Sequence, residues 1–196
     1  MREIHGAKHF SFIPKTFILP NEFVYLEDEM KKNKEKLWIC KPAASSQGRG
    51  IFVTNDLSEI PHKNQPMVVC EYIESPLLFN GFKFDLRIYV AITCVNPLRI
   101  YIYEDGLTRF ATSKYSVNIT GNKKGLKFAH LTNFSVNKKN INFIQTDSEA
   151  DGTGSKWSLV ALRNTFREHG IDDNAIFRKI EDICIKTVLA AEPYMF

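Results

Sequence analysis

The sequence predicts an α+β fold built on antiparallel sheet, and three observations support this prediction. Residues 82–112 contain β-rich runs separated by two turn signals, which is the pattern of an antiparallel meander. The last third of the chain changes to apolar residues at helical spacing. Helix, strands and helices therefore follow one another without the regular alternation of strand and helix that a parallel sheet requires.

Length and composition indicate a globular chain. At about 150 residues per domain, its 196 residues are enough for one large domain. An aromatic content of 12% excludes a chain that is disordered throughout. No stretch approaches the roughly 18 consecutive apolar residues of a membrane-spanning helix, and the first residues lack the apolar segment of a signal peptide. We therefore expect a cytoplasmic location without a membrane partner, and four reduced cysteines, because none forms a C-x-x-C pair.

The first half of the chain predicts one helix and three short strands. An extended entry leads into a helix with Asn21 as its N-cap, acidic residues early and lysines late, as the helix dipole favours. The following segments are predicted as strand, loop, strand and strand, at residues 37–41, 43–50, 51–54 and 67–73. The last of these is mostly apolar, so we expect it to be buried on both faces.

The second half predicts a meander followed by two helices. The three meander strands are expected at residues 82–93, 98–104 and 108–112, with turns at 96–97 and 105–106. A helix is expected over residues 155–169, ending at Gly170, and a second one capped by Asp172 or Asp173. Residues 141–154 are polar and rich in Gly, Asp and Ser, and predict a mobile loop.

Three charged residues alternate along the first meander strand. Lys83, Asp85 and Arg87 would share one face of that strand, because successive side chains point to opposite faces. They could form a solvated charge ladder. They could instead line a cleft. The apolar residues 90–92 favour a central strand, and charged side chains on a central strand usually line a cleft because burying them without a partner is costly. Lys, Asp and Arg suit a phosphate, a metal and a carboxylate respectively.

Two other segments carry polar chemistry. The loop at residues 44–51 contains two glycines, which permit close backbone approach to a ligand, but it matches neither a P-loop nor a Rossmann fingerprint. Lys41 precedes it between apolar neighbours, where a lysine either extends to solvent or binds an anion. His130-Leu131-Thr132-Asn133 is a compact cluster of donors and acceptors that, taken alone, predicts a turn.

Positive charge is concentrated in the second half of the chain. Net charge is only +4, yet no Asp or Glu occurs between Gly106 and Thr146, a stretch that holds seven lysines and arginines. The stretch could be a solvated loop or a surface that attracts an anion such as a nucleotide or an acidic peptide. We expect no nucleic-acid partner, because the lysines are not interleaved with aromatics and no zinc-finger or helix-turn-helix pattern occurs.

Taken in order, these segments resemble the tubulin–tyrosine ligase-like family. The resemblance covers nearly the whole chain. The residues that carry it are His5-Gly6, Phe12-Ile13-Pro14, 16–20, 38–42, 45–51, Tyr72-Ile73, Pro76-Leu77-Leu78, 82–90, 103–107, 109–112, 130–133, 135–138 and Lys156-Trp157-Ser158. Lys-Phe-Asp-Leu-Arg-Ile-Tyr-Val at 83–90 resembles the glutamylase branch more than the glycylase form, which usually carries Gln-Trp after the Arg.

The resemblance implies an ATP-grasp-like fold and an ATP-dependent ligase. Such an enzyme uses ATP and Mg²⁺ to add free L-glutamate to glutamate side chains in the acidic C-terminal tails of tubulin, through an acyl phosphate. It further implies a cytoplasmic, cytoskeletal location, extending to cilia and basal bodies. Glycylase or tyrosine ligase activity on the same fold is one alternative. A non-catalytic module that binds nucleotide or acidic tails is another.

The resemblance also implies roles for individual residues. Lys83, Asp85 and Arg109 would be catalytic, with Asp85 near Mg²⁺ but an indirect ligand. ATP would be bound by Lys41, Gln47, Gly48, Arg49, Gly50, Ile51, Cys70, Glu71, Tyr72, Ile73, Lys83, Asp85, Thr132 and Asn133. Within this set, residues 47–51 would be a flexible flap and residues 70–73 the adenine hinge. Substrate carboxylates would be held by Arg87, Arg109 and Lys138.

The family pattern continues beyond the residues present here. It carries a further strand pair, with an acidic residue and a Glu-x-Asn that supply the main Mg²⁺ ligands, after the helix matched by residues 176–191. Residues 1–196 are therefore expected to be a partial domain, incomplete at the C-terminus and inactive in ligation alone.

Overall fold

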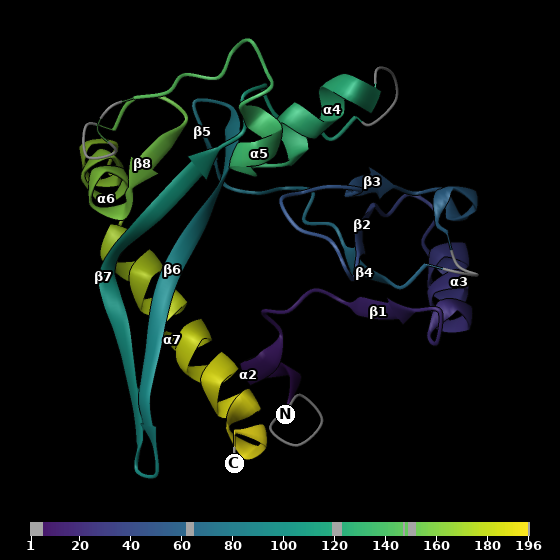
Figure 1. The fold of residues 1–196 in the computed structure, drawn as a ribbon, viewed down its shortest axis with the longest axis horizontal. Helices are drawn as coiled ribbons and strands as arrows, with labels where there is room; N and C mark the ends of the chain where they lie inside the picture. The colour runs from purple at the N-terminus through teal and green to yellow at the C-terminus, as the bar shows by residue number, and fades with distance from the viewer. Residues whose placement is uncertain (1–5, 62–64, 119–122, 147, 149–151, 196) are drawn as a thin grey trace. The chain divides into compact units, whose positions relative to one another are not determined.

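In this computed structural model, the structure describes residues 6–61, 65–118, 123–146, 148 and 152–195. They form a mixture of helices and antiparallel sheet, which confirms the predicted fold class at this level (Figure 1). The chain divides into two compact units. Unit 1 comprises Met1–Phe12, Asp85–Phe110 and Ile144–Phe196, and unit 2 comprises Ile13–Phe84 and Ala111–Phe143. None of the helices in the described residues combines the length and the apolar character that a membrane crossing requires.

Unit 2 is built on a four-stranded antiparallel sheet of order β1-β4-β2-β3. Its elements are β1 (Thr16–Leu19), α3 (Phe23–Lys32), β2 (Trp38–Pro42), β3 (Phe52–Thr54), a 3-10 turn (Leu57–Glu59) and β4 (Met67–Glu71). They are followed by β5 (Leu78–Phe79), α4 (Lys123–His130) and α5 (Phe134–Asn137). The predicted helix, loop and strands of the first half are thus confirmed to within one or two residues.

One face of this sheet packs against α3. Leu26 and Met30 of the helix join Phe17, Trp38, Cys40 and Val69 of the strands in a buried core. The helix begins one residue later than predicted, with Glu22 rather than Asn21 as N-cap. The Glu22 side chain makes no capping hydrogen bond, and its carboxylate instead accepts a 2.6 Å hydrogen bond from the Ile18 backbone N–H.

The prediction that β4 is buried on both faces is wrong. Met67 and Val69 are fully buried against α3, whereas Val68 and Cys70 on the other face are only half-buried. An apolar run does not reveal whether a second layer covers the sheet. The second face of the sheet therefore remains accessible in part.

The second sheet has the order β5-β6-β7-β8, so β6 is internal only along its first residues. β6 (Phe82–Val95) and β7 (Leu98–Phe110) are long strands joined at Asn96-Pro97, as predicted, and they form most of the hairpin in Figure 1. β8 (Lys156–Ser158) pairs with β7 from far along the chain. Unit 1 also contains α2 (Ala7–Phe10), α6 (Leu159–Glu168), α7 (Asp173–Ala191) and a final 3-10 turn (Glu192–Tyr194).

Two predicted boundaries in unit 1 are wrong. Asp105-Gly106 is not a turn, because β7 continues through it and includes most of the predicted third strand. The Asp105 carboxylate instead accepts hydrogen bonds from the backbone N–H groups of Leu159 and Val160, at the start of α6. A Cβ on Gly106 would lie 2.3 Å from the Arg87 carbonyl oxygen, so glycine is needed for close strand approach rather than for a turn.

The predicted helix over 155–169 starts later than expected. Residues 156–158 form β8, and Ser158 then caps α6, its hydroxyl accepting a 3.0 Å hydrogen bond from the Ala161 N–H. The helix ends before Gly170 as predicted, and Asp172 caps α7 by accepting from the Ala175 N–H. Within the predicted loop, residues 141–146, 148 and 152–154 contain neither helix nor strand, and residues 147 and 149–151 lie outside the described residues.

Candidate functional site

Lys41 lies on the partly accessible face of the first sheet. The register places it opposite Val68, while Ile39 lies opposite Cys70. We define the lysine face as the side of the sheet away from α3, formed by Thr16, Ile18, Ile39, Lys41, Val53, Val68 and Cys70. Thr16, Ile18 and Lys41 are exposed, while the rest are half-buried. The lysine face is mostly apolar and carries one cation, a composition that suits a flat aromatic ligand carrying an anionic group.

The predicted flap contacts the segment after His130. Its backbone includes three residues with positive φ, Gln47 (61°), Gly48 (75°) and Gly50 (71°). The Ser135 hydroxyl donates a 2.6 Å hydrogen bond to the Gln47 carbonyl oxygen. A Cβ on Gly48 would lie 2.8 Å from Asn133 Oδ1. The close approach predicted for this glycine is therefore made to Asn133, so two predicted segments that are distant in sequence meet within unit 2.

In the predicted hinge at residues 70–73, the two central backbone N–H groups already donate hydrogen bonds within the chain. The Glu71 N–H donates to the Lys15 carbonyl oxygen at 2.8 Å, and the Tyr72 N–H donates to the Leu37 carbonyl oxygen at 2.9 Å. A ligand at this hinge would therefore have to use carbonyl groups or the backbone of Ile73, which is 60% exposed. The Glu71 side chain forms a 3.0 Å ion pair with Lys36.

Lys83 is held by two oxygen atoms of unit 2. Its Nζ donates 3.0 Å hydrogen bonds to the Tyr72 hydroxyl and to the His130 carbonyl oxygen. It also lies 4.7 Å from the centroid of the Tyr72 ring, within cation–π range. Tyr72 and His130 are buried, at 5% and 3% exposure, and the Tyr72 hydroxyl lies 2.7 Å from His130 Nδ1. Lys83 is therefore a cation with a defined position.

Burial shifts the titration of this cluster. It raises the pKa of Tyr72, and a hydrogen bond involving Tyr115 adds to the increase. It lowers the pKa of His130, and the nearby charge of Lys83 lowers it further. The Tyr72 hydroxyl and the His130 ring are therefore both neutral near pH 7, so Lys83 is the cation at the centre of the group.

Asp85 and Arg109 pair with each other in unit 1. Arg109 Nε donates to Asp85 Oδ1 at 2.9 Å, and a second guanidinium nitrogen donates to Oδ2, which makes the pair bidentate. The pair raises the pKa of Arg109. Arg109 thus binds a carboxylate, as its predicted role requires, but that carboxylate belongs to the chain itself. A substrate would have to use the remaining guanidinium N–H groups or displace Asp85.

The remaining predicted residues occupy varied positions. Arg87 is an exposed residue of β6 in unit 1. Lys138 is exposed in unit 2, with its ammonium 5.4 Å from the Phe134 ring centroid. Thr132 is buried, and Asn133 is the N-cap residue of α5. Unit 2 thus contains Lys41, the flap, the hinge, Lys83, Thr132, Asn133 and Lys138, whereas unit 1 contains Asp85, Arg87 and Arg109.

A polar network behind Thr132 was not predicted. Asn137 is 1% exposed, and its Oδ1 accepts from the backbone N–H and the hydroxyl of Thr112. Its Nδ2 donates to the carbonyl oxygens of Leu131 and Asn133. The network fixes the backbone around Thr132. The His130–Asn133 cluster was interpreted from sequence as a simple turn, and the dense Asn and Ser content that follows it was the only available signal.

The basic stretch contributes exposed lysines to unit 2. Lys114, Lys127, Lys138 and Lys139 are exposed there. The Lys114 ammonium donates to the Asn80 carbonyl oxygen and lies 4.2 Å from the Phe82 ring centroid. The Lys114 ammonium is therefore engaged within unit 2, whereas the other exposed lysines can attract an anionic partner.

The described residues provide no metal centre. Within the part of the chain that the structure describes, no three His, Cys, Asp or Glu side chains lie close enough together to hold a metal ion. Asp85, the predicted indirect ligand, has both carboxylate oxygens engaged by Arg109. Mg²⁺ is accordingly assigned to no residue here.

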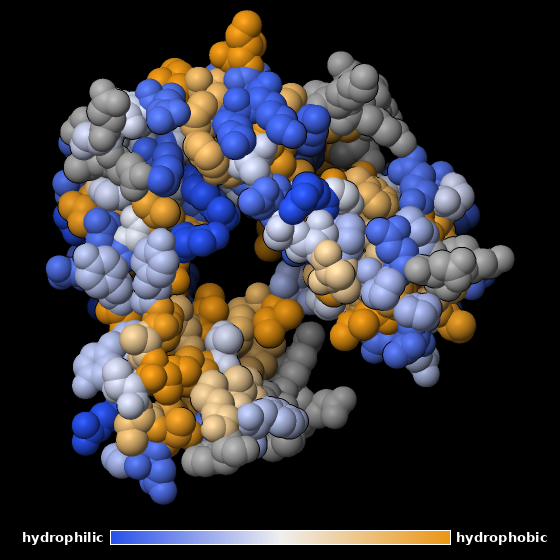
Figure 2. All heavy atoms as spheres, in the orientation of Figure 1, coloured by the Kyte–Doolittle hydropathy of each residue, from blue (hydrophilic) through white to orange (hydrophobic). Residues whose placement is uncertain are grey.

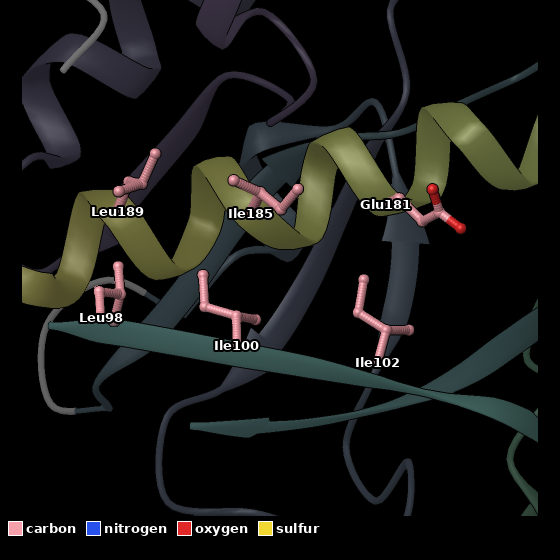
Figure 3. A pocket seen from close by; sticks show the side chains of 6 residues that line it. All are labelled: Leu98, Ile100, Ile102, Glu181, Ile185 and Leu189. Atoms are coloured by element: carbon pink, nitrogen blue, oxygen red, sulfur yellow. The ribbon is translucent and has the colours of Figure 1, made fainter. Parts of the chain in front are cut away.

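Unit 1 contains an apolar groove that involves none of the predicted site residues. Figure 3 shows Leu98, Ile100 and Ile102 of β7 projecting toward α7, which contributes Glu181, Ile185 and Leu189. The volume is about 440 Å³. In Figure 2 apolar side chains gather over the hairpin and α7, where Val90, Ile92, Ile185 and Leu189 are 37–43% exposed. The groove lacks the cations that the predicted chemistry requires.

Comparison with known proteins gives one consistent result. The sequence model of the tubulin-tyrosine ligase family matches residues 1–196. Human tubulin monoglutamylase TTLL4 is 44% identical over 195 residues, which covers 100% of this chain and 16% of that protein. Human tubulin polyglutamylase TTLL5 is 40% identical over 193 residues (98% and 15%), and mouse tubulin polyglutamylase TTLL6 is 41% identical over 186 residues (95% and 22%). The chain thus spans less than a quarter of the length of these three relatives.

Proposed function

Because the chain belongs to the tubulin-tyrosine ligase family, we propose that it forms part of an ATP-dependent ligase that adds glutamate to tubulin. The observation that carries this proposal is the likeness to proteins named as tubulin glutamylases, which extends over 95–100% of the chain. The proposed fold within the family is ATP-grasp-like. The proposed site of action is the cytoplasm and its microtubules, including those of cilia.

The proposed reaction joins two carboxylate-bearing substrates. A glutamate side chain in an acidic tubulin tail takes the terminal phosphoryl group of ATP, which gives an acyl phosphate and ADP. The deprotonated amine of free L-glutamate then attacks the acyl carbon and expels phosphate, forming an amide bond. This chemistry needs cations for phosphate oxygens and for carboxylates. Mg²⁺ would neutralise phosphate charge during the transfer.

Two cations of unit 2 suit the nucleotide. The lysine face offers apolar side chains for a purine and Lys41 for a phosphate. Lys83 offers a second, positioned ammonium. We propose that residues 47–51 cover the phosphates and that Thr132 and Asn133 contact the nucleotide, which is supported by the contact between Gly48 and Asn133.

The carboxylates need further cations. We propose that Arg109, Arg87 and Lys138 bind carboxylates of the incoming glutamate or of the acceptor. The bidentate contact of Arg109 with Asp85 supports carboxylate recognition by this guanidinium. The exposed lysines of unit 2 would attract the acidic tail, and this attraction should weaken as salt increases.

A transfer assay tests this function. The whole native protein that carries this chain is incubated with tubulin, Mg-ATP and labelled glutamate, glycine or tyrosine. We expect glutamate incorporation, its loss in Lys83→Ala, and its retention in Lys31→Ala, because Lys31 pairs with Glu27 on the surface of α3. Incorporation of glycine or tyrosine instead would reassign the substrate. A folded protein that transfers none of the three would indicate a non-catalytic binding module.

A further inference from the structure

We infer that Tyr72 and His130 are positioning residues that hold the ammonium group of Lys83 in one place and orientation. The inference rests on the proposed function only for the identity of the anion, which would be a nucleotide phosphate. The sequence-based prediction gave Tyr72 a place in the adenine hinge and His130 a place in a turn. The inference adds a function for both side chains.

The contacts around Lys83 define a fixed position. A lysine side chain has four rotatable bonds, and ordering it costs conformational entropy. Here Nζ donates to two oxygens, each at 3.0 Å, one from the Tyr72 hydroxyl and one from the backbone of His130. The Tyr72 ring lies 4.7 Å from the same nitrogen. The conformational entropy of the Lys83 side chain is therefore lost on folding, so anion binding does not have to order this side chain.

The direction of each hydrogen bond follows from chemistry. An ammonium group can only donate, so the Tyr72 oxygen accepts from Lys83. The single hydroxyl proton of Tyr72 is then available to His130 Nδ1, 2.7 Å away. We infer that this proton is donated to Nδ1, which requires the neutral His130 ring with its proton on Nε2, a buried atom to which the described residues give no hydrogen-bond partner. A charged ring would remove the acceptor for Tyr72 and place a second cation beside Lys83.

The surroundings keep this arrangement rigid and His130 neutral. The Tyr115 ring packs edge-on against His130 at 5.1 Å between centroids, and its hydroxyl donates to the Glu74 carbonyl oxygen at 2.7 Å. The Tyr72 backbone is tied to Leu37. The titratable or charged groups facing the His130 ring are thus Tyr72, Tyr115, Lys83 and, less directly, Glu74. The cluster combines burial with a defined chain of donors and acceptors.

The ammonium group itself provides the direct test. The ¹H–¹⁵N signal of the Lys83 ammonium, assigned by its loss in Lys83→Ala, is observable only while hydrogen bonds slow its exchange with water. We expect it in the wild type, in His130→Asn, whose amide oxygen replaces Nδ1 as acceptor, and in Tyr115→Phe. The last variant is the control, because it loosens the same cluster without removing an acceptor of Lys83. We expect exchange at least tenfold faster in Tyr72→Phe and in His130→Leu.

Nucleotide binding by the same variants distinguishes the positioning of Lys83 by Tyr72 and His130 from the proposed binding of nucleotide phosphate by Lys83. If Lys83 binds phosphate, Tyr72→Phe should weaken Mg-ADP binding about tenfold, and His130→Asn should restore most of the affinity lost in His130→Leu. A wild type that binds no Mg-ADP would overturn nucleotide binding, while the ammonium signal would still decide the inference. The inference is overturned if that signal is absent in the wild type or unchanged in Tyr72→Phe.

Discussion

At the scale of single residues, the sequence identified cations but not their partners. Lys83 was predicted to face a ligand, and its partners Tyr72 and His130 lie 11 and 47 positions away in the sequence. The pairing of Asp85 with Arg109 was equally hidden, because alternation along one strand says nothing of the neighbouring strand. The Asn- and Ser-rich run that contains Asn137 indicates polar chemistry, but it does not reveal the buried network that Asn137 forms. Residue types could thus be predicted, and side-chain contacts between distant segments could not.

Cys40 and Cys70 offer a residue-level test of the lysine face. Cys40 is fully buried on the α3 side, where burial raises its pKa to about 12, whereas Cys70 lies on the lysine face and is half-buried. Iodoacetamide at pH 8 should therefore modify Cys70 well before Cys40. Mg-ADP at ten times its Kd should slow the modification of Cys70 by about tenfold, because only the free protein reacts. Mass spectrometry of the native chain measures both rates.

Cys94 serves as the internal control for that experiment. It is half-buried in unit 1, where its thiol donates to the Asn96 carbonyl oxygen at 3.3 Å. Its modification rate should not respond to nucleotide. An unchanged rate at Cys70 under saturating Mg-ADP would rule out a nucleotide lying over this residue.

At the scale of elements, local signals predicted α3, α6, α7 and most strands but not α2, α4 or α5, and long-range pairing determined two errors in unit 1. Asp105-Gly106 is a strong turn signal, yet it lies inside β7 because its carboxylate caps α6 and its glycine permits close strand approach. β8 was predicted as helix because residues 156–158 become a strand only through pairing with β7. Both errors arise where an element depends on a partner some 50 residues away.

Gly106→Ala tests the account of this strand. The added methyl group would meet the Arg87 carbonyl oxygen at 2.3 Å and the Leu159 side chain at 2.9 Å, so strand and helix must shift. We expect a loss of about 2–3 kcal/mol in the free energy of unfolding, measured with urea. The matched control is Gly170→Ala in the same unit. There nothing lies within 4 Å, and only the positive φ of 71° is unfavourable, at about 1 kcal/mol. A cost for Gly106→Ala no larger than the control would contradict the close approach.

The corner between α6 and α7 predicts an acid-dependent stability. Asp173 is 2% exposed and accepts hydrogen bonds from Arg163 and Arg167. The hydrogen bond from Arg167, and then that from Arg163, lower the pKa of Asp173 below its ordinary value of 3.8. A carboxyl with a lowered folded-state pKa stabilises the fold above that ordinary value, and the contribution disappears as pH falls through the folded-state pKa.

Asp173→Asn measures that contribution. The variant should have a lower urea midpoint than the wild type at pH 7. The difference should shrink below about pH 4, where the Asp173 carboxyl begins to bind a proton in the unfolded chain, and it should vanish as pH falls through the lowered folded-state pKa. Asp182→Asn is the control, because Asp182 pairs with Lys186 on the exposed surface of α7. A difference that is constant from pH 7 to pH 3 would show that the charge of Asp173 does not stabilise the corner.

At the scale of the whole molecule, the sequence predicted one antiparallel α+β domain, and the chain folds as two units assembled from interleaved segments. Unit 2 takes residues 13–84 and 111–143, so the hairpin of unit 1 interrupts it. Composition and periodicity describe neighbours in sequence and cannot reveal such interleaving. The family resemblance did predict which residues of unit 2 carry the candidate nucleotide chemistry, and their roles stay predictions.

A thermal melt of the chain with and without Mg-ADP tests the central claim most directly. A ligand that binds only the folded state raises the midpoint, by an amount set by its concentration relative to Kd. We predict a clear increase for the wild type and for Lys31→Ala, and its loss in Lys41→Ala, whose only change is the cation of the lysine face. A cooperative wild-type melt without any shift, or an equal shift in Lys41→Ala, would contradict nucleotide binding at that face.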